Sequence, residues 1–176
     1  MEDLFSVVAT TCLPTVVGRD TVQCFASPRY VYRDWRLVKL LSEHQPTRGG
    51  CIIATLAPRR PTLFTEWAAS ILGVLAYTPS SVLGRHLRAR KHVLTLPQIE
   101  RVVEVSENES GTGLRPTGGG NFAFVENKDE SVSLVDVKYS TGWNAFSLQF
   151  GDDLRWSTGC LLLLRVGGVD IPRIGS

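Results

Sequence analysis

The residue types that do most enzyme chemistry are few and scattered in this sequence. Its three histidines are His44, His86 and His92, and the closest two, six residues apart, fit neither one helix face nor a compact ligand pattern. Asp152 and Asp153 are adjacent, so on a strand or turn their carboxylates point in different directions. The GxSxG, GxxxxGK[ST] and HExxH patterns do not occur. We therefore expect no catalytic residues, no metal site, no cofactor and no enzymatic activity.

Two glycine-rich segments, 111–113 and 118–120, could suggest phosphate-binding loops. Such a loop needs a helix after it, so that the helix N-terminus faces the phosphate, whereas the residues that follow here have the composition of a strand. Flexible loops are the favoured interpretation.

The strongest concentration of charge is basic and lies between residues 85 and 92. Two interpretations remain open: a solvated loop, or a contact with RNA or with an acidic neighbouring subunit. Aromatic residues are not interleaved with these cations, which disfavours stacking on single-stranded bases. The candidate contact residues, including a smaller basic pair upstream, are Arg59, Arg60, Arg85, Arg88, Arg90 and Lys91.

The cysteines and the hydropathy pattern predict a soluble cytoplasmic product. Cys12, Cys24, Cys51 and Cys160 form no CxxC pair, which favours free thiols in a reducing compartment. The N-terminus lacks the pattern of a signal peptide, and no run of about 18 apolar residues could cross a membrane. The net charge of +2 is too small for a domain whose main task is phosphate binding.

The elements that would position these residues are mostly short strands. Runs rich in β-branched and aromatic residues, bounded by turn residues, predict nine of them. They span residues 21–25, 31–41, 51–57, 92–96, 101–106, 121–126, 132–139, 145–150 and 159–166. The continuous apolar run 161–164 indicates a strand that is covered on both faces or that meets another subunit.

One segment departs from this pattern. Apolar residues recur at helical spacing between Thr62 and Tyr77, which predicts a helix with Thr62 as its N-cap and Pro79 after its end. Without internal repeats, the 176 residues form one domain, and residues 1–20 are expected to be an N-terminal extension. Short strands, one helix and glycine-rich turns predict an all-β, eight-stranded jelly-roll β-sandwich.

Several segments resemble the coat-protein domain of picorna-like viruses, in particular the small coat subunits of plant secovirids such as cheraviruses and torradoviruses. The matching segments are 30–36 (YVYRDWR), 49–58, 92–96, 102–105, 120–125 and 132–139. Two features depart from the family pattern. The proline-aromatic end of the sixth strand is missing after Val105, and nine runs stand where eight are needed, so the last strand is either 145–150 or 159–166.

The resemblance implies a structural capsid protein that assembles an icosahedral shell around RNA, located in the virion and the host cytoplasm. Its partners would be other coat subunits and, non-specifically, genomic RNA, with no membrane. Two alternatives remain: a viral RNA-binding or movement-type β-sandwich protein, and a cupin-like or lectin-like module. Salt-sensitive RNA binding would favour the first, and a histidine–carboxylate metal set or an aromatic cleft would favour the second.

Overall fold

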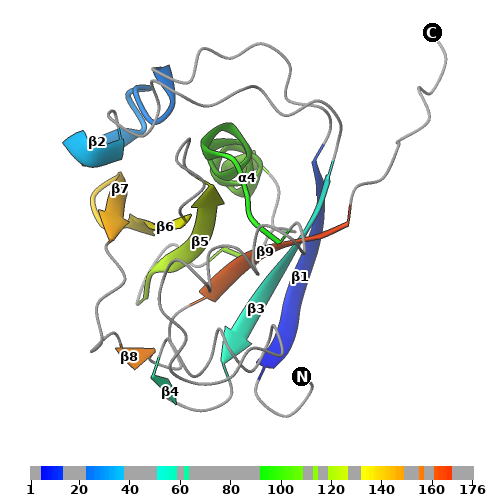
Figure 1. The fold of residues 1–176 in the computed structure, drawn as a ribbon. Helices are drawn as coiled ribbons and strands as arrows, with labels where there is room; N and C mark the ends of the chain where they lie inside the picture. Colours follow the sequence, from blue (N-terminus) through cyan, green and yellow to red (C-terminus); the bar gives the residue numbers. More distant parts are fainter. Residues whose placement is uncertain are drawn as a thin grey trace, which may run out of the picture.

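The computed structural model describes residues 5–13, 23–37, 51–58, 62–63, 92–108, 113–114, 119–126, 132–148, 155–156 and 161–167. The chain is mostly β, and seven strands form one mixed sheet in the order β1-β3-β9-β5-β6-β7-β2 (Figure 1). These strands are β1 (Phe5–Leu13), β2 (Tyr30–Arg33), β3 (Cys51–Pro58), β5 (Asn121–Glu126), β6 (Val132–Tyr139), β7 (Trp143–Leu148) and β9 (Leu161–Gly167). Two further strands, β4 (Thr62–Leu63) and β8 (Arg155–Trp156), pair separately.

Most neighbouring strands of the large sheet are antiparallel, but two pairs are parallel. β5 runs parallel to β9 in the middle of the sheet, and β2 runs parallel to β7 at one end. Among the described strands, β1 and β2 are therefore the two edges. Residues 5–13, expected to lie in an N-terminal extension, instead form the edge strand β1 on β3.

The helix α4 (Leu96–Asn108) lies beside the sheet (Figure 1). Its start is a capping box: the Thr95 backbone N–H donates to the Gln98 side chain at 2.9 Å, and the Gln98 N–H donates back to the Thr95 hydroxyl at 3.4 Å. Leu96, Ile99 and Val103 are fully buried at helical spacing. These apolar residues of α4 pack against one face of the sheet.

The strands predicted at 92–96 and 101–106 are therefore wrong. Residues 101–106 lie inside α4, and in the first segment only Leu94 makes a bridge, to Val125. Val102, Val103 and Val105 suggested a strand by type, but the Thr95–Gln98 cap and the apolar spacing outweigh that preference.

Two other predictions also need correction. The strand predicted at 31–41 ends at Arg33, and residues 35–37 are helical because the Asp34 carboxylate accepts the Arg36 N–H at 3.0 Å, as an N-cap does. In the strand predicted at 21–25, residues 23–25 instead form a turn.

The predicted helix at 62–77 is wrong at its start, because Thr62 belongs to β4 and does not cap a helix. Residues 64–77 lie outside the described residues. The strands predicted at 51–57, 121–126 and 132–139 are confirmed, and both C-terminal candidates contain strands, β7 and β9.

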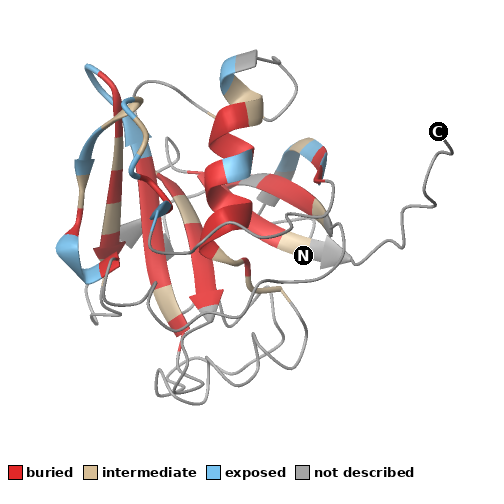
Figure 2. Cartoon of the chain, turned by 90° about the horizontal axis from the view of Figure 1, so that it is seen from above, coloured by how far each residue is buried: buried red, intermediate tan, exposed pale blue. Residues whose placement is uncertain are grey.

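Both faces of the sheet are buried around β9, one of its interior strands. Leu161 to Leu164 are each 3% exposed or less, although alternate residues of a strand point to opposite faces. Figure 2 shows buried residues along the strands of the sheet. Leu163 belongs to the cluster that contains the buried residues of α4, whereas Leu162 and Leu164 lie on the other face. Of the two interpretations of this apolar run, the structure supports coverage of both faces by the chain itself.

Candidate functional site

All six basic residues proposed to contact RNA or a subunit, Arg59, Arg60, Arg85, Arg88, Arg90 and Lys91, lie outside the described residues, as do Asp152 and Asp153. His92 is described, and its Nδ1 lies 2.9 Å from the Arg165 carbonyl oxygen in a backbone contact. The described residues instead bring together two other features, a polar cluster and an exposed apolar surface, and both involve β2.

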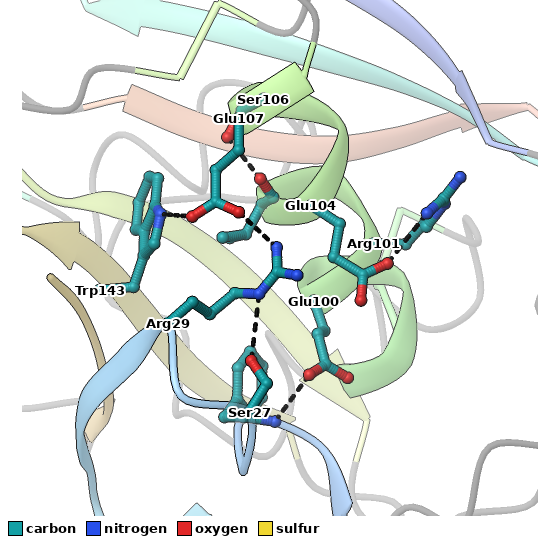
Figure 3. Close-up of polar contacts among 10 residues, drawn as sticks. Ser27, Arg29, Glu100, Arg101, Glu104, Ser106, Glu107 and Trp143 are labelled. Carbon is teal, nitrogen blue, oxygen red and sulfur yellow. Dashed lines mark hydrogen bonds and ion pairs between the residues drawn. The ribbon is translucent and has the colours of Figure 1, made fainter.

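The polar cluster begins with three glutamates of α4. Glu100, Glu104 and Glu107 follow one another at helical spacing, and Figure 3 shows them along the side of the helix near the turn that precedes β2. Glu100 is only 3% exposed and accepts the Phe25 backbone N–H at 3.1 Å. Phe25 has a φ of 58°, which is unfavourable for an aromatic residue, so this hydrogen bond helps to hold a strained turn.

Glu107 joins three elements through its two carboxylate oxygens. Oε2 accepts Arg29 Nη1 at 2.6 Å, and Oε1 accepts the Trp143 indole Nε1 at 2.9 Å (Figure 3). Arg29 Nε also donates to the Ser27 hydroxyl at 3.0 Å. The carboxylate thus ties α4 to the turn before β2 and to the start of β7.

Tyr30, the first residue of β2, packs inside this cluster. Its ring meets the Phe25 ring edge-on at 5.2 Å, and its hydroxyl oxygen is buried without a hydrogen-bond partner in the described part of the chain. Burial, reinforced by Glu100, raises the pKa of Tyr30 well above its ordinary value. Because the Tyr30 phenol stays protonated, it is a poor acid or base near neutral pH. Its buried ring is instead suited to anchoring the start of β2.

A second anchor fixes the other end of β2. The Asp34 carboxylate, 2% exposed, accepts two hydrogen bonds from the Arg36 guanidinium to Oδ2, at 2.7 and 3.1 Å, and the Ser147 N–H from β7 at 3.3 Å. The Asp34 N–H donates to the Ala145 carbonyl at 2.9 Å. Burial opposes ionisation of Asp34, but the hydrogen bonds from Arg36 and Ser147 outweigh it and lower its pKa.

Three large apolar side chains in this region project into solvent, two of them between the anchors and Trp35 just after the second anchor. Val31 is 57% exposed, Tyr32 45% and Trp35 69%, and we name these three residues the β2 surface. The Tyr32 ring lies 5.0 Å from the Phe146 ring of β7. Gly142 sits against Val31, where a Cβ would come within 2.7 Å of the valine methyl group. Val31 and Tyr32 are therefore exposed but packed against β7 and the turn before it.

The sequence carried a signal for this surface that the predictions did not use. Residues 29–36 alternate aromatic residues with arginines, which suggested one long strand. The Asp34 cap, three residues before the end of the described helical segment, places Trp35 outside that strand and away from the core. By contrast, residues 161–164, for which a subunit contact was one of two interpretations, are buried within the chain.

Comparison with protein-family models, with curated proteins and with solved structures gave no match to this chain. Within the described residues, no helix is long and apolar enough to span a membrane. The case for a function therefore depends on the geometry of the anchored strand and on the sequence resemblance.

Proposed function

We propose that this chain is a structural subunit that assembles with other protein subunits through the β2 surface. The observation that carries the proposal is the exposure of Val31 and Tyr32 on a strand that is held at both ends, and of Trp35 in the helical segment that follows it. Tyrosine and tryptophan contribute most to binding when they are presented rigidly, because little side-chain freedom is then lost on association.

The apolar run 161–164, which the sequence offered as a possible subunit contact, is not available for one. The β2 surface is therefore the apolar surface on which the proposal depends. Residues 161–164 are enclosed by the chain itself, so they cannot contribute to a contact without unfolding. Trp35 alone offers enough apolar area for roughly 1.5–3 kcal/mol on full burial, before the cost of association.

The resemblance to picorna-like coat proteins extends the proposal to a viral capsid subunit in a shell around RNA. A jelly roll would require strands outside the described residues to complete a second sheet, for which the β4–β8 pair is a starting point. It would also have to accommodate the parallel β5–β9 and β2–β7 pairs. Assembly through β2 requires only the anchored strand and is independent of that topology.

The proposal is tested by sedimentation velocity of the full chain, alone and co-expressed with candidate sibling subunits. Trp35→Ala should weaken association at least about tenfold, the effect of losing roughly 1.4 kcal/mol at a contact. Tyr139→Ala is the matched control, because Tyr139 is an exposed aromatic residue, 40% accessible, that lies outside the β2 surface. A wild-type chain that stays monomeric with every sibling would end the proposal, as would equal association of Trp35→Ala and wild type.

A further inference from the structure

A row of four side chains crosses one face of the sheet and ends at the β2 surface. In the strand register, Phe122 of β5 lies opposite Asp136 of β6, and Asp136 lies opposite Phe146 of β7. Directly opposed residues share a face and come into contact. Tyr32 continues the row through its ring contact with Phe146, at 5.0 Å. A carboxyl group therefore lies between two aromatic rings, one step from the proposed interface.

The carboxyl group of Asp136 is enclosed. The residue is 7% exposed, and its Oδ1 is buried without a hydrogen-bond partner in the described part of the chain. Gly120 packs against this oxygen so closely that a Cβ there would lie 2.4 Å from it. Burial raises the pKa of Asp136 to about 6, opposed by the charge of Lys138 and a backbone hydrogen bond from Asn121.

Lys138 lies two residues along β6 and so projects from the same face as Asp136. Its ammonium nitrogen sits 4.6 Å from the centre of the Phe146 ring, in cation–π geometry. The neighbouring strands present rings to Asp136, Phe122 from β5 and Phe146 from β7. Arg36, beyond Tyr32, is held by Asp34. Among the described residues, Lys138 is therefore the cation that responds to the charge of Asp136.

We propose that Asp136 and Lys138 form a proton-controlled latch that sets how firmly β2 is held against β7. With Asp136 neutral, the Lys138 ammonium stays over Phe146, whose ring contacts Tyr32. When the Asp136 proton passes to solvent, the carboxylate attracts the Lys138 ammonium away from the Phe146 ring. The ammonium then no longer covers the ring that contacts Tyr32, and this contact weakens. The link to assembly rests on the function proposed above, whereas the latch itself is a property of the single chain.

The latch predicts that β2 is held more firmly at acidic than at neutral pH. We expect an effect of about tenfold on the local opening of β2, the size of a strong cation–π contact. The test is hydrogen exchange by mass spectrometry on the dilute full chain at about pH 5 and about pH 7.5, corrected for intrinsic exchange. Protection of residues 30–33 should fall about tenfold at the higher pH, while β1 changes little.

Two variants make the test specific. Asp136→Asn should keep β2 protected at both pH values, because the amide is nearly isosteric and stays uncharged. Lys138→Met should also remove the pH dependence of β2, although Asp136 still titrates, because the moving cation is gone. The latch is overturned if wild-type β2 shows no pH dependence, or if either variant shows the same dependence as wild type. These outcomes are measured on monomers, so they are distinct from the assembly test of Trp35→Ala.

Discussion

The two edges of the seven-stranded sheet are held in different ways. β1 spans nine residues without a charged side chain and pairs along its length with β3, with an irregularity between Val7 and Ala9. β2 has four residues, pairs in parallel with β7, and depends on the carboxylates of Glu107 and Asp34. A backbone ladder is insensitive to pH and salt, whereas side-chain ion pairs are not. The comparison therefore identifies β2 as the edge whose position can be adjusted.

The edges also differ in what they expose. β1 presents Val7 and Val8, 64% and 46% exposed, next to an irregularity of the kind that protects sheet edges from pairing with other chains. β2 and the helical segment after it present Val31, Tyr32 and Trp35, and aromatic residues of this kind dominate the energetics of protein interfaces. We therefore assign the interaction surface to β2 and not to β1.

The largest effect is expected from removing the buried anchor of β2. Asp34→Ala leaves the Ser147 N–H and the following helical turn without their acceptor, so the free energy of unfolding should fall by about 3 kcal/mol. Urea denaturation measures this loss. Thr10→Ala on the exposed part of β1 is the control and should change stability by less than about 0.5 kcal/mol. Similar losses in both variants would mean that the edges are not held differently.

The next effect is the pH dependence of stability caused by Asp136. Its pKa is raised from 3.8 to about 6, so the folded chain binds the proton more tightly than the unfolded chain. The resulting stabilisation is complete below pH 3.8 and is lost as the pH rises through about 6, a decrease on the order of 2–3 kcal/mol. Urea melts at several pH values should show this decrease in wild type and not in Asp136→Asn. A decrease of the same size in the variant would assign it to other groups.

The smallest effect concerns the partly exposed ion pair at the start of β2. Glu107→Gln keeps an acceptor for Trp143 but removes the charge that faces Arg29, which should cost about 1 kcal/mol. Raising the salt concentration from about 0.15 M to about 1 M should weaken wild type more than the variant, because salt screens the ion pair. Arg101→Ala, which breaks the partly buried pair with Glu104 away from β2, provides the comparison. An unchanged salt response in Glu107→Gln would show that this pair does not anchor β2.

The sequence predicted the sheet better than it predicted the site. Apolar runs at 121–126, 132–139 and 161–164 identify strands. A strand buried on one face has alternating apolar residues, and a strand buried on both faces has a continuous apolar run, so both patterns are visible in the local sequence. The sequence-based prediction failed at two places where a helix N-cap begins a helical segment. Thr95 and Asp34 each begin a helical segment inside residues that favour strands by type.

The site could not be predicted because its contacts join residues far apart in the chain. Glu107 meets Arg29 across 78 positions, and Asp34 meets Ser147 across 113. No local pattern connects such pairs. The alternation of aromatic and basic residues at 29–36 was visible, but only the two anchors show which of those side chains turn outward.

The most direct test of β2 as the assembly surface is hydroxyl-radical footprinting of the chain, isolated and in assembled particles. Trp35, 69% exposed in the single chain, should react readily when isolated and become at least about fivefold less reactive after assembly, while Val7 on β1 changes little. Equal reactivity of Trp35 in both states, or protection of Val7 instead, would contradict the account.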